Sequence, residues 1–151
     1  MRQAMLKGAS IMWYSKILVA YDGSKPSDRA VEIACDMARE NPQAQIVFAH
    51  VLKLVGSTMG ESGMNQILFG QARDIQRRLE EVAAPFGARA RVLMLKGSSP
   101  ATLLVSCCEE EDCDVIVMGS RGMGGVKGYL GSVSRSVVQE AKACVVVAKE
   151  Q

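Results

Sequence analysis

A chain of 151 residues has the size of one protein domain, so a second domain is not expected. Hydrophobic residues make up 48% of the chain and charged residues 23%, which are ordinary proportions for a globular protein. The formal net charge of +2 is too small to indicate a nucleic-acid partner, which would call for a clustered basic surface. Aromatic residues are 5% of the chain, so a base-stacking surface is also disfavoured.

The start of the chain and its apolar runs indicate a cytoplasmic protein. Residues 1–14 lack the apolar core of a secretory signal, and we expect a disordered N-terminal extension there, followed by one domain over 15–151. No apolar run approaches the ~20 residues of a membrane span, so no membrane partner is expected. The five cysteines show no zinc-binding spacing and are interpreted as reduced cytosolic thiols.

Along the chain, short apolar runs alternate with segments of helical period. The expected strands are 16–21, 45–51, 90–95, 114–118 and 144–148. The expected helices are 26–40, capped by Ser24 or Ser27; 64–86; one that begins at Ser99-Pro100; and a last one capped by Ser132. Strands that are apolar throughout predict a parallel sheet covered on both faces. The fold class is therefore α/β, a single-domain, doubly wound, open, parallel five-stranded sheet of the Rossmann-like kind, with the order βαβαβαβαβ.

In such sheets ligands bind beyond the carboxyl ends of the strands, so the loops at those ends are the candidate sites. The loop over 52–63 contains three glycines and is long for its place. Two interpretations of this loop are equally favoured: a functional loop and a disordered segment without function.

The loop from Gly119 to Ser132 carries six glycines in fourteen positions. Glycines let the backbone approach a ligand closely and present N–H groups to an anion, and a helix start adds further free N–H groups. Arg121 and Lys127 add two cations. This chemistry predicts a phosphate site, with a flexible surface loop as the alternative. Neither GxxxxGK[ST] nor a GxGxxG that opens a helix after the first strand is present, which disfavours those two nucleotide sites.

The motif Gly119-x2-Gly122 leading to Gly131-Ser132, together with the opening segment 16–24, resembles the universal stress protein family over about residues 16–148. The resemblance implies a fold of the adenine nucleotide alpha hydrolase-like type. In that family the pattern G-x2-G-x9-G-[ST] marks members that bind ATP. Here eight residues separate Gly122 from Gly131, one fewer than in the pattern, so a tighter loop is expected.

The resemblance also implies ten nucleotide-binding positions. It places Asp22 near the adenine or the ribose and Val51 against the base. The alternatives are a turn-forming role for Asp22 and a plain core position for Val51. The other positions line the ribose–phosphate path and the triphosphate: Met118, Gly119, Arg121, Gly122, Gly131, Ser132, Val133 and Ser134.

The expected function is therefore that of an ATP-binding, nucleotide-dependent regulator of the stress response, with the presence of Mg²⁺ left open. ATP would order the loops over 52–63 and 119–131 and so change a surface read by an unknown protein partner. The resemblance further implies a homodimer through the last strand, Cys144 to Ala148. The lone His50 is interpreted as a satisfied core residue, and no catalytic residue is expected. Two alternatives remain: a slow Mg-dependent ATP hydrolase or phosphotransferase, and a dimeric stress protein that binds no nucleotide and acts by protein contacts.

Overall fold

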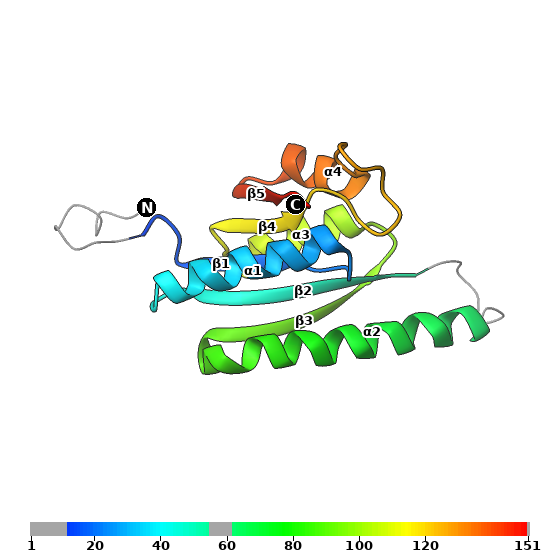
Figure 1. Ribbon diagram of the computed structural model, residues 1–151, viewed down its shortest axis with the longest axis horizontal. Coiled ribbons are helices and arrows are strands. Elements are labelled where there is room, and N and C mark those ends of the chain that lie inside the picture. Colours follow the sequence, from blue (N-terminus) through cyan, green and yellow to red (C-terminus); the bar gives the residue numbers. More distant parts are fainter. Residues whose placement is uncertain (1–11, 55–61, 151) are drawn as a thin grey trace.

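The structure is a computed structural model that describes residues 12–54 and 62–150 (Figure 1). Its strands are β1 (Lys16–Ala20), β2 (Gln45–Lys53), β3 (Ala90–Gly97), β4 (Val115–Gly119) and β5 (Cys144–Ala148). Its helices are α1 (Lys25–Glu40), α2 (Ser62–Ala83), the short 3-10 helix η3 (Ala84–Arg89), α3 (Pro100–Glu110) and α4 (Ser132–Glu140).

The strands form one sheet in the order β3-β2-β1-β4-β5, and every pair of neighbours is parallel. The expected fold class is confirmed. From β1 the chain crosses first to β2 on one side and later to β4 on the other. The strand order therefore reverses at β1, whose Ile17 is in register with both Ile46 and Val115.

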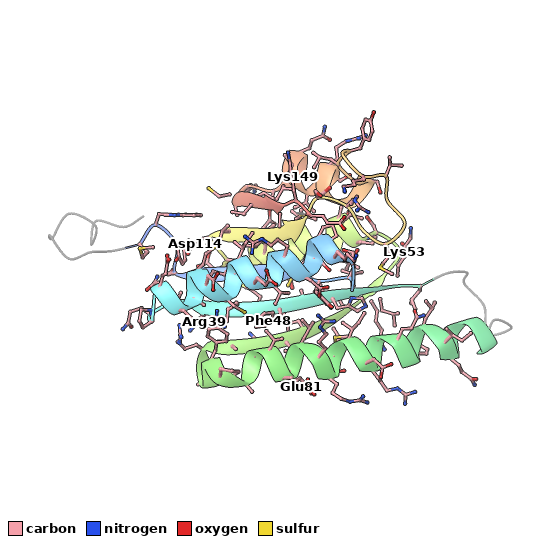
Figure 2. All side chains as sticks on the ribbon, viewed as in Figure 1. Arg39, Phe48, Lys53, Glu81, Asp114 and Lys149 are labelled. Carbon is pink, nitrogen blue, oxygen red and sulfur yellow. The ribbon has the colours of Figure 1, made fainter. Side chains whose placement is uncertain are left out.

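Helices cover both faces of the sheet, as the uninterrupted apolar strands predict. Alternate residues of β1 enter different cores: Ile17 and Val19 pack with α1 and α2, whereas Leu18 and Ala20 pack with α3 and α4. Figure 2 shows Phe48 inside the molecule and the charged side chains of Arg39 and Glu81 at its surface. In the part of the chain that the structure describes, no helix is both long and apolar enough to cross a membrane.

The start of α1 follows from the residues after β1. Ser24 is the N-cap, and its hydroxyl accepts a hydrogen bond from the Ser27 N–H (3.2 Å). Pro26 occupies the first turn, where a missing N–H costs nothing. Of the two expected caps, Ser24 is the one that is used. The Ser27 hydroxyl instead donates to the Ser24 carbonyl (2.8 Å).

Several expected boundaries differ from the observed ones, and two of the differences have identifiable reasons. The helix expected over 64–86 ends at Ala83, because Pro85 lacks an N–H and Gly87 has φ +58°, and Phe86 reaches the core from η3 instead. Strand β2 runs on to Lys53, beyond the expected end at residue 51, because it keeps pairing with β3 as far as Gly97. Residues 55–61 of the expected loop lie outside the described residues.

The residues just before β1 already pack against the folded domain. Tyr14 is buried, and its hydroxyl donates to the Met37 carbonyl at the end of α1 (2.8 Å). The Asn41 side-chain amide returns a bond to the Tyr14 carbonyl (2.9 Å). Tyr14 thus packs as part of the core, whereas residues 1–11 of the expected extension lie outside the description.

Candidate functional site

A cleft of about 620 Å³ opens at the carboxyl ends of β1, β2 and β4, where the strand order reverses. All ten positions expected from the sequence line it: Asp22, Val51, Met118, Gly119, Arg121, Gly122, Gly131, Ser132, Val133 and Ser134. They come from five elements or loops, and only the sheet topology brings them together.

One part of the cleft is apolar. Val51, Leu52 and Leu104 line it together with Leu68 and Ile75 of α2. Sequence reasoning missed the contribution of α2, which lies beyond the glycine-containing loop, and it missed Lys53, a cation on the cleft wall. The signal for Lys53 was the apolar Leu52 before it, which shows that β2 continues past residue 51.

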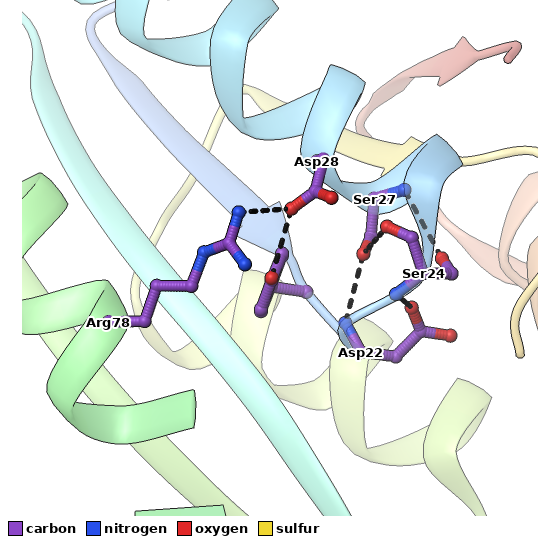
Figure 3. A network of polar contacts seen from close by, with 6 residues as sticks. Asp22, Ser24, Ser27, Asp28 and Arg78 are labelled. Carbon is purple, nitrogen blue, oxygen red and sulfur yellow. Dashed lines mark hydrogen bonds and ion pairs between the residues drawn. The ribbon is translucent and has the colours of Figure 1, made fainter. Parts of the chain in front are cut away.

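Asp22 follows β1 and has two roles, one for each carboxylate oxygen. Its Oδ1 accepts a hydrogen bond from the Ser24 N–H (2.9 Å), so the turn-forming interpretation holds for this atom (Figure 3). Its Oδ2 faces the glycine loop: a Cβ added to Gly122 would lie 2.6 Å from it. Because Gly122 has no side chain, Oδ2 of Asp22 can lie close to the backbone of the glycine loop.

Beside the cleft, a polar network ties α1 to α2 (Figure 3). The Tyr21 hydroxyl (3.0 Å) and the Arg78 guanidinium (2.8 Å) both donate to Oδ1 of Asp28. The Arg78 guanidinium also lies 5.5 Å from the centre of the Tyr21 ring. Burial, and after it the hydrogen bond to Asp28, raises the pKa of Tyr21 to about 12. Tyr21 lines the cleft, so the network holds one of its sides in place.

The ends of the glycine loop are fastened to each other and to the sheet. The Ser120 carbonyl accepts from the Gly131 N–H (2.8 Å) and from the Ser134 hydroxyl (2.7 Å), and the Ser120 N–H donates to the Ala148 carbonyl at the end of β5 (2.8 Å). Gly124 and Gly128 have φ of +75° and +91°, which favours glycine at both positions. Because its hydroxyl proton is used within the loop, Ser134 offers the cleft its backbone N–H.

Helix α4 begins differently from the sequence expectation. Gly131 is the N-cap, with no side-chain capping bond, and Ser132 is the first helical residue, so a capping role for Ser132 is wrong. The physical reason is that the Gly131 carbonyl already accepts the first helical bond, from the Arg135 N–H (3.0 Å). The N–H groups of Ser132, Val133 and Ser134 have no intrahelical acceptor, and these residues line the cleft. The site thus has the free donors and the positive end of a helix dipole that favour an anion.

The two cations of the loop lie in different surroundings. Arg121 lines the cleft, but its guanidinium donates to the Gly125 carbonyl (3.0 Å) and is paired with Glu150, just after β5. Lys127 is exposed and does not line the cleft. Arg121 therefore already has an anionic partner within the chain.

His50 lines the cleft as a buried residue with a satisfied ring nitrogen. Its Nδ1 lies 2.7 Å from the Tyr21 carbonyl oxygen, which can only accept, so this nitrogen carries the proton. Among the described residues, no three His, Cys, Asp or Glu side chains cluster closely enough to hold a metal ion.

Comparison with known proteins gives a consistent result. The model of the "Universal stress protein family" matches residues 14–149. A Thermus aquaticus protein named "Universal stress protein in QAH/OAS sulfhydrylase 3'region" is 33% identical over 138 residues, which cover 90% of this chain and 99% of that protein.

Solved structures agree in fold. The universal stress protein from Archaeoglobus fulgidus in complex with dAMP has a TM-score of 0.68 at 26% identity, over 91% of this chain and 100% of that one. A universal stress protein in complex with cAMP has a TM-score of 0.70 at 24% identity, over 93% and 100% of the two chains, which shows a shared fold. With its parallel sheet, its cleft and the family match over nearly its whole length, this chain belongs to the universal stress protein family.

Proposed function

We propose that the protein binds an adenine nucleotide, ATP, in this cleft and acts as a nucleotide-dependent regulator of the stress response. The observation that carries the proposal is a convergence at one cleft: the Asp22 carboxylate, the glycine loop and the first turn of α4. A volume of about 620 Å³ suits a small-molecule site. The dAMP complex of the relative from Archaeoglobus fulgidus supports an adenine nucleotide as the ligand class.

The two ends of the cleft suit the two ends of ATP. The apolar part around Val51 would hold the base, and Oδ2 of Asp22 would accept hydrogen bonds from ribose hydroxyls. The N–H groups of Ser132, Val133 and Ser134 would donate to the phosphates. Any Mg²⁺ would be carried mainly by phosphate oxygens, as is usual for this ion.

The proposed regulatory surface is the glycine loop itself. Met123, Val126 and Tyr129 are 74%, 69% and 70% exposed, so the loop presents a group of large apolar side chains to solvent. Exposed apolar groups of this kind are typical of protein contact sites. Nucleotide that binds more tightly to one arrangement of the loop would change how these side chains are presented to a partner.

We further propose that the protein is a homodimer through β5 and that it acts in the cytoplasm. β5 lies at one edge of the sheet, and its residues from Cys144 to Val147 are exposed or only partly buried. Pairing of two such strands would cover an apolar edge that otherwise invites aggregation. The cysteines of the described chain are free thiols, as is typical of reducing compartments.

The nucleotide proposal is tested by calorimetric titration with ATP of the native protein and of two matched variants. In Gly122→Ala the new Cβ would displace the Asp22 carboxylate, so we expect at least about a tenfold loss of affinity. In Gly70→Ala, within α2, the same methyl group meets open space, so we expect unchanged affinity. Circular dichroism of both variants should match that of the native protein.

The same samples separate the alternatives. Sustained phosphate release from Mg-ATP, abolished by Asp22→Ala, would favour a hydrolase. A native protein that binds no ATP up to millimolar concentration would overturn the proposal and favour action through protein contacts alone.

A further inference from the structure

The turn between α3 and β4 brings two cysteines together by backbone geometry. The Cys113 N–H donates to the Cys108 carbonyl (2.9 Å), and the Asp112 N–H donates to the Glu109 carbonyl (3.1 Å). Asp112 has φ +56°, in the left-handed region. These bonds form a Schellman motif, in which the side chains in the positions of Cys108 and Cys113 meet.

The two cysteines also contact each other directly. The Cys108 thiol lies 3.6 Å from the Cys113 carbonyl oxygen, to which it donates. The interaction between the two side chains lowers the pKa of Cys108 below its ordinary value and, together with burial, raises that of Cys113. Cys108 is 4% exposed and Cys113 is partly exposed, so the pair lies just beneath the surface.

We propose that Cys108 and Cys113 are a redox modification site, where hydrogen peroxide converts the two thiols into a reversible intrachain disulfide. A thiolate sulfur attacks one peroxide oxygen and displaces hydroxide, which takes up a proton, and a sulfenic acid results. The second sulfur attacks the sulfenic sulfur and releases water. In total, two thiols and one peroxide give one disulfide and two waters, with two electrons passing from sulfur to oxygen. A dithiol reductant reverses the reaction by thiol–disulfide exchange.

The other cysteines lack this arrangement and serve as internal controls. Cys107 is equally buried, but burial, with Glu111 as a lesser cause, raises its pKa to about 11. Cys35 lies in the core on the opposite face of the sheet. Cys144 is exposed on β5 and has no neighbouring thiol on its own strand.

The disulfide would fix a turn that anchors the start of the sheet. The Asp114 carboxylate, next to Cys113, accepts from the N–H groups of Ser15 (2.6 Å) and Lys16 (3.0 Å) at the start of β1. Glu111 pairs with Lys16 and Arg91. This turn precedes β4, whereas the cleft lies beyond the other end of that strand, so the modification is separate from the nucleotide site. We therefore expect oxidation to stabilise the fold.

The test treats the reduced full chain with hydrogen peroxide, blocks the remaining thiols with iodoacetamide and maps the peptides by mass spectrometry. We expect a Cys108–Cys113 cross-link, loss of two of the five free thiols, and full recovery with dithiothreitol. The melting temperature of the oxidised protein should rise by roughly 4 to 8 °C, because the disulfide closes a short loop and so lowers the conformational entropy of the unfolded chain.

Matched variants decide the assignment. Cys107→Ser should keep the cross-link, whereas Cys108→Ser and Cys113→Ser should each abolish it while keeping the circular dichroism of the native protein. If Cys108→Ser unfolds, Cys113→Ser carries the comparison alone. A cross-link through Cys107 or between Cys144 of two copies, or oxidation that stops at single sulfinic acids, would overturn the proposal.

Discussion

Two glycines shape the site because their missing side chains leave room for named neighbours. A Cβ on Gly122 would meet the Asp22 carboxylate, and one on Gly119 would lie 2.8 Å from backbone atoms of Pro26 and Ser27. Gly119 thus lets the end of β4 approach the start of α1. The same motif therefore contains one glycine that leaves room at the cleft, Gly122, and one that allows close packing of the backbone, Gly119.

The space around each glycine predicts how an alanine substitution changes the stability of the fold. Gly119→Ala should lower the free energy of unfolding by roughly 1–3 kcal/mol, because backbone atoms have to move. Gly70→Ala should raise it by about 0.5–1 kcal/mol, because alanine favours a helix and the site is open. Urea denaturation of the two variants measures both changes. Equal stability of Gly119→Ala and the native protein would contradict the close approach.

At the scale of elements, the sequence predicts the helix starts and strand positions that depend on neighbouring residues alone. Ser24 and Pro26 marked the start of α1, and the apolar runs marked all five strands. Pro85 carried the signal for the end of α2, but the helix was expected to continue to Phe86 because apolar residues recur at helical spacing up to that position. Leu79, Ala83 and Phe86 are all buried; only the backbone changes from α-helix to 3-10 helix before Phe86.

Interactions between distant elements had no signal in the sequence. The family resemblance places Arg121 on the phosphate path, but its pairing with Glu150 depends on β5 lying beside β4. The partner of Asp28 is likewise Arg78, fifty residues away on α2. Such pairs follow from strand order and helix packing, which a single sequence does not reveal.

The network of Tyr21, Asp28 and Arg78 predicts a loss of stability at alkaline pH. The pKa of Tyr21 is raised from 10.0 to about 12, so folding favours the neutral phenol. The stabilisation is complete below pH 10 and is lost as the pH rises towards 12. We expect the free energy of unfolding to fall over this window, and to fall less in Tyr21→Phe. Parallel declines in the two proteins would show that Tyr21 is not responsible.

At the scale of the whole molecule, the sheet order places the two proposed sites on neighbouring strands. The reversal at β1 places the cleft at the carboxyl ends of the inner strands, while β5 is left at one edge. The Ser120–Ala148 bond and the Arg121–Glu150 pair connect the glycine loop to the end of that edge strand. The proposed nucleotide site and the proposed dimer edge are therefore physically joined.

The edge predicts the effect of a charge in β5. If two copies pair through β5, Val146→Lys should yield a monomer by light scattering at micromolar concentration, because a charge buried at the proposed strand interface is costly. Val138→Lys, on the exposed side of α4, should remain a dimer. A native protein that is already monomeric would contradict the proposed assembly.

Nucleotide binding in the cleft is tested most directly by the backbone amide spectrum of the native protein during titration with ATP. We predict that the amide signals of Gly122 and of Gly131 to Ser134 shift with nucleotide. The amide signals of Glu109 to Cys113, before the other end of β4, should stay unchanged. A spectrum without shifts at millimolar ATP, or shifts confined to residues outside the cleft, would contradict the assignment.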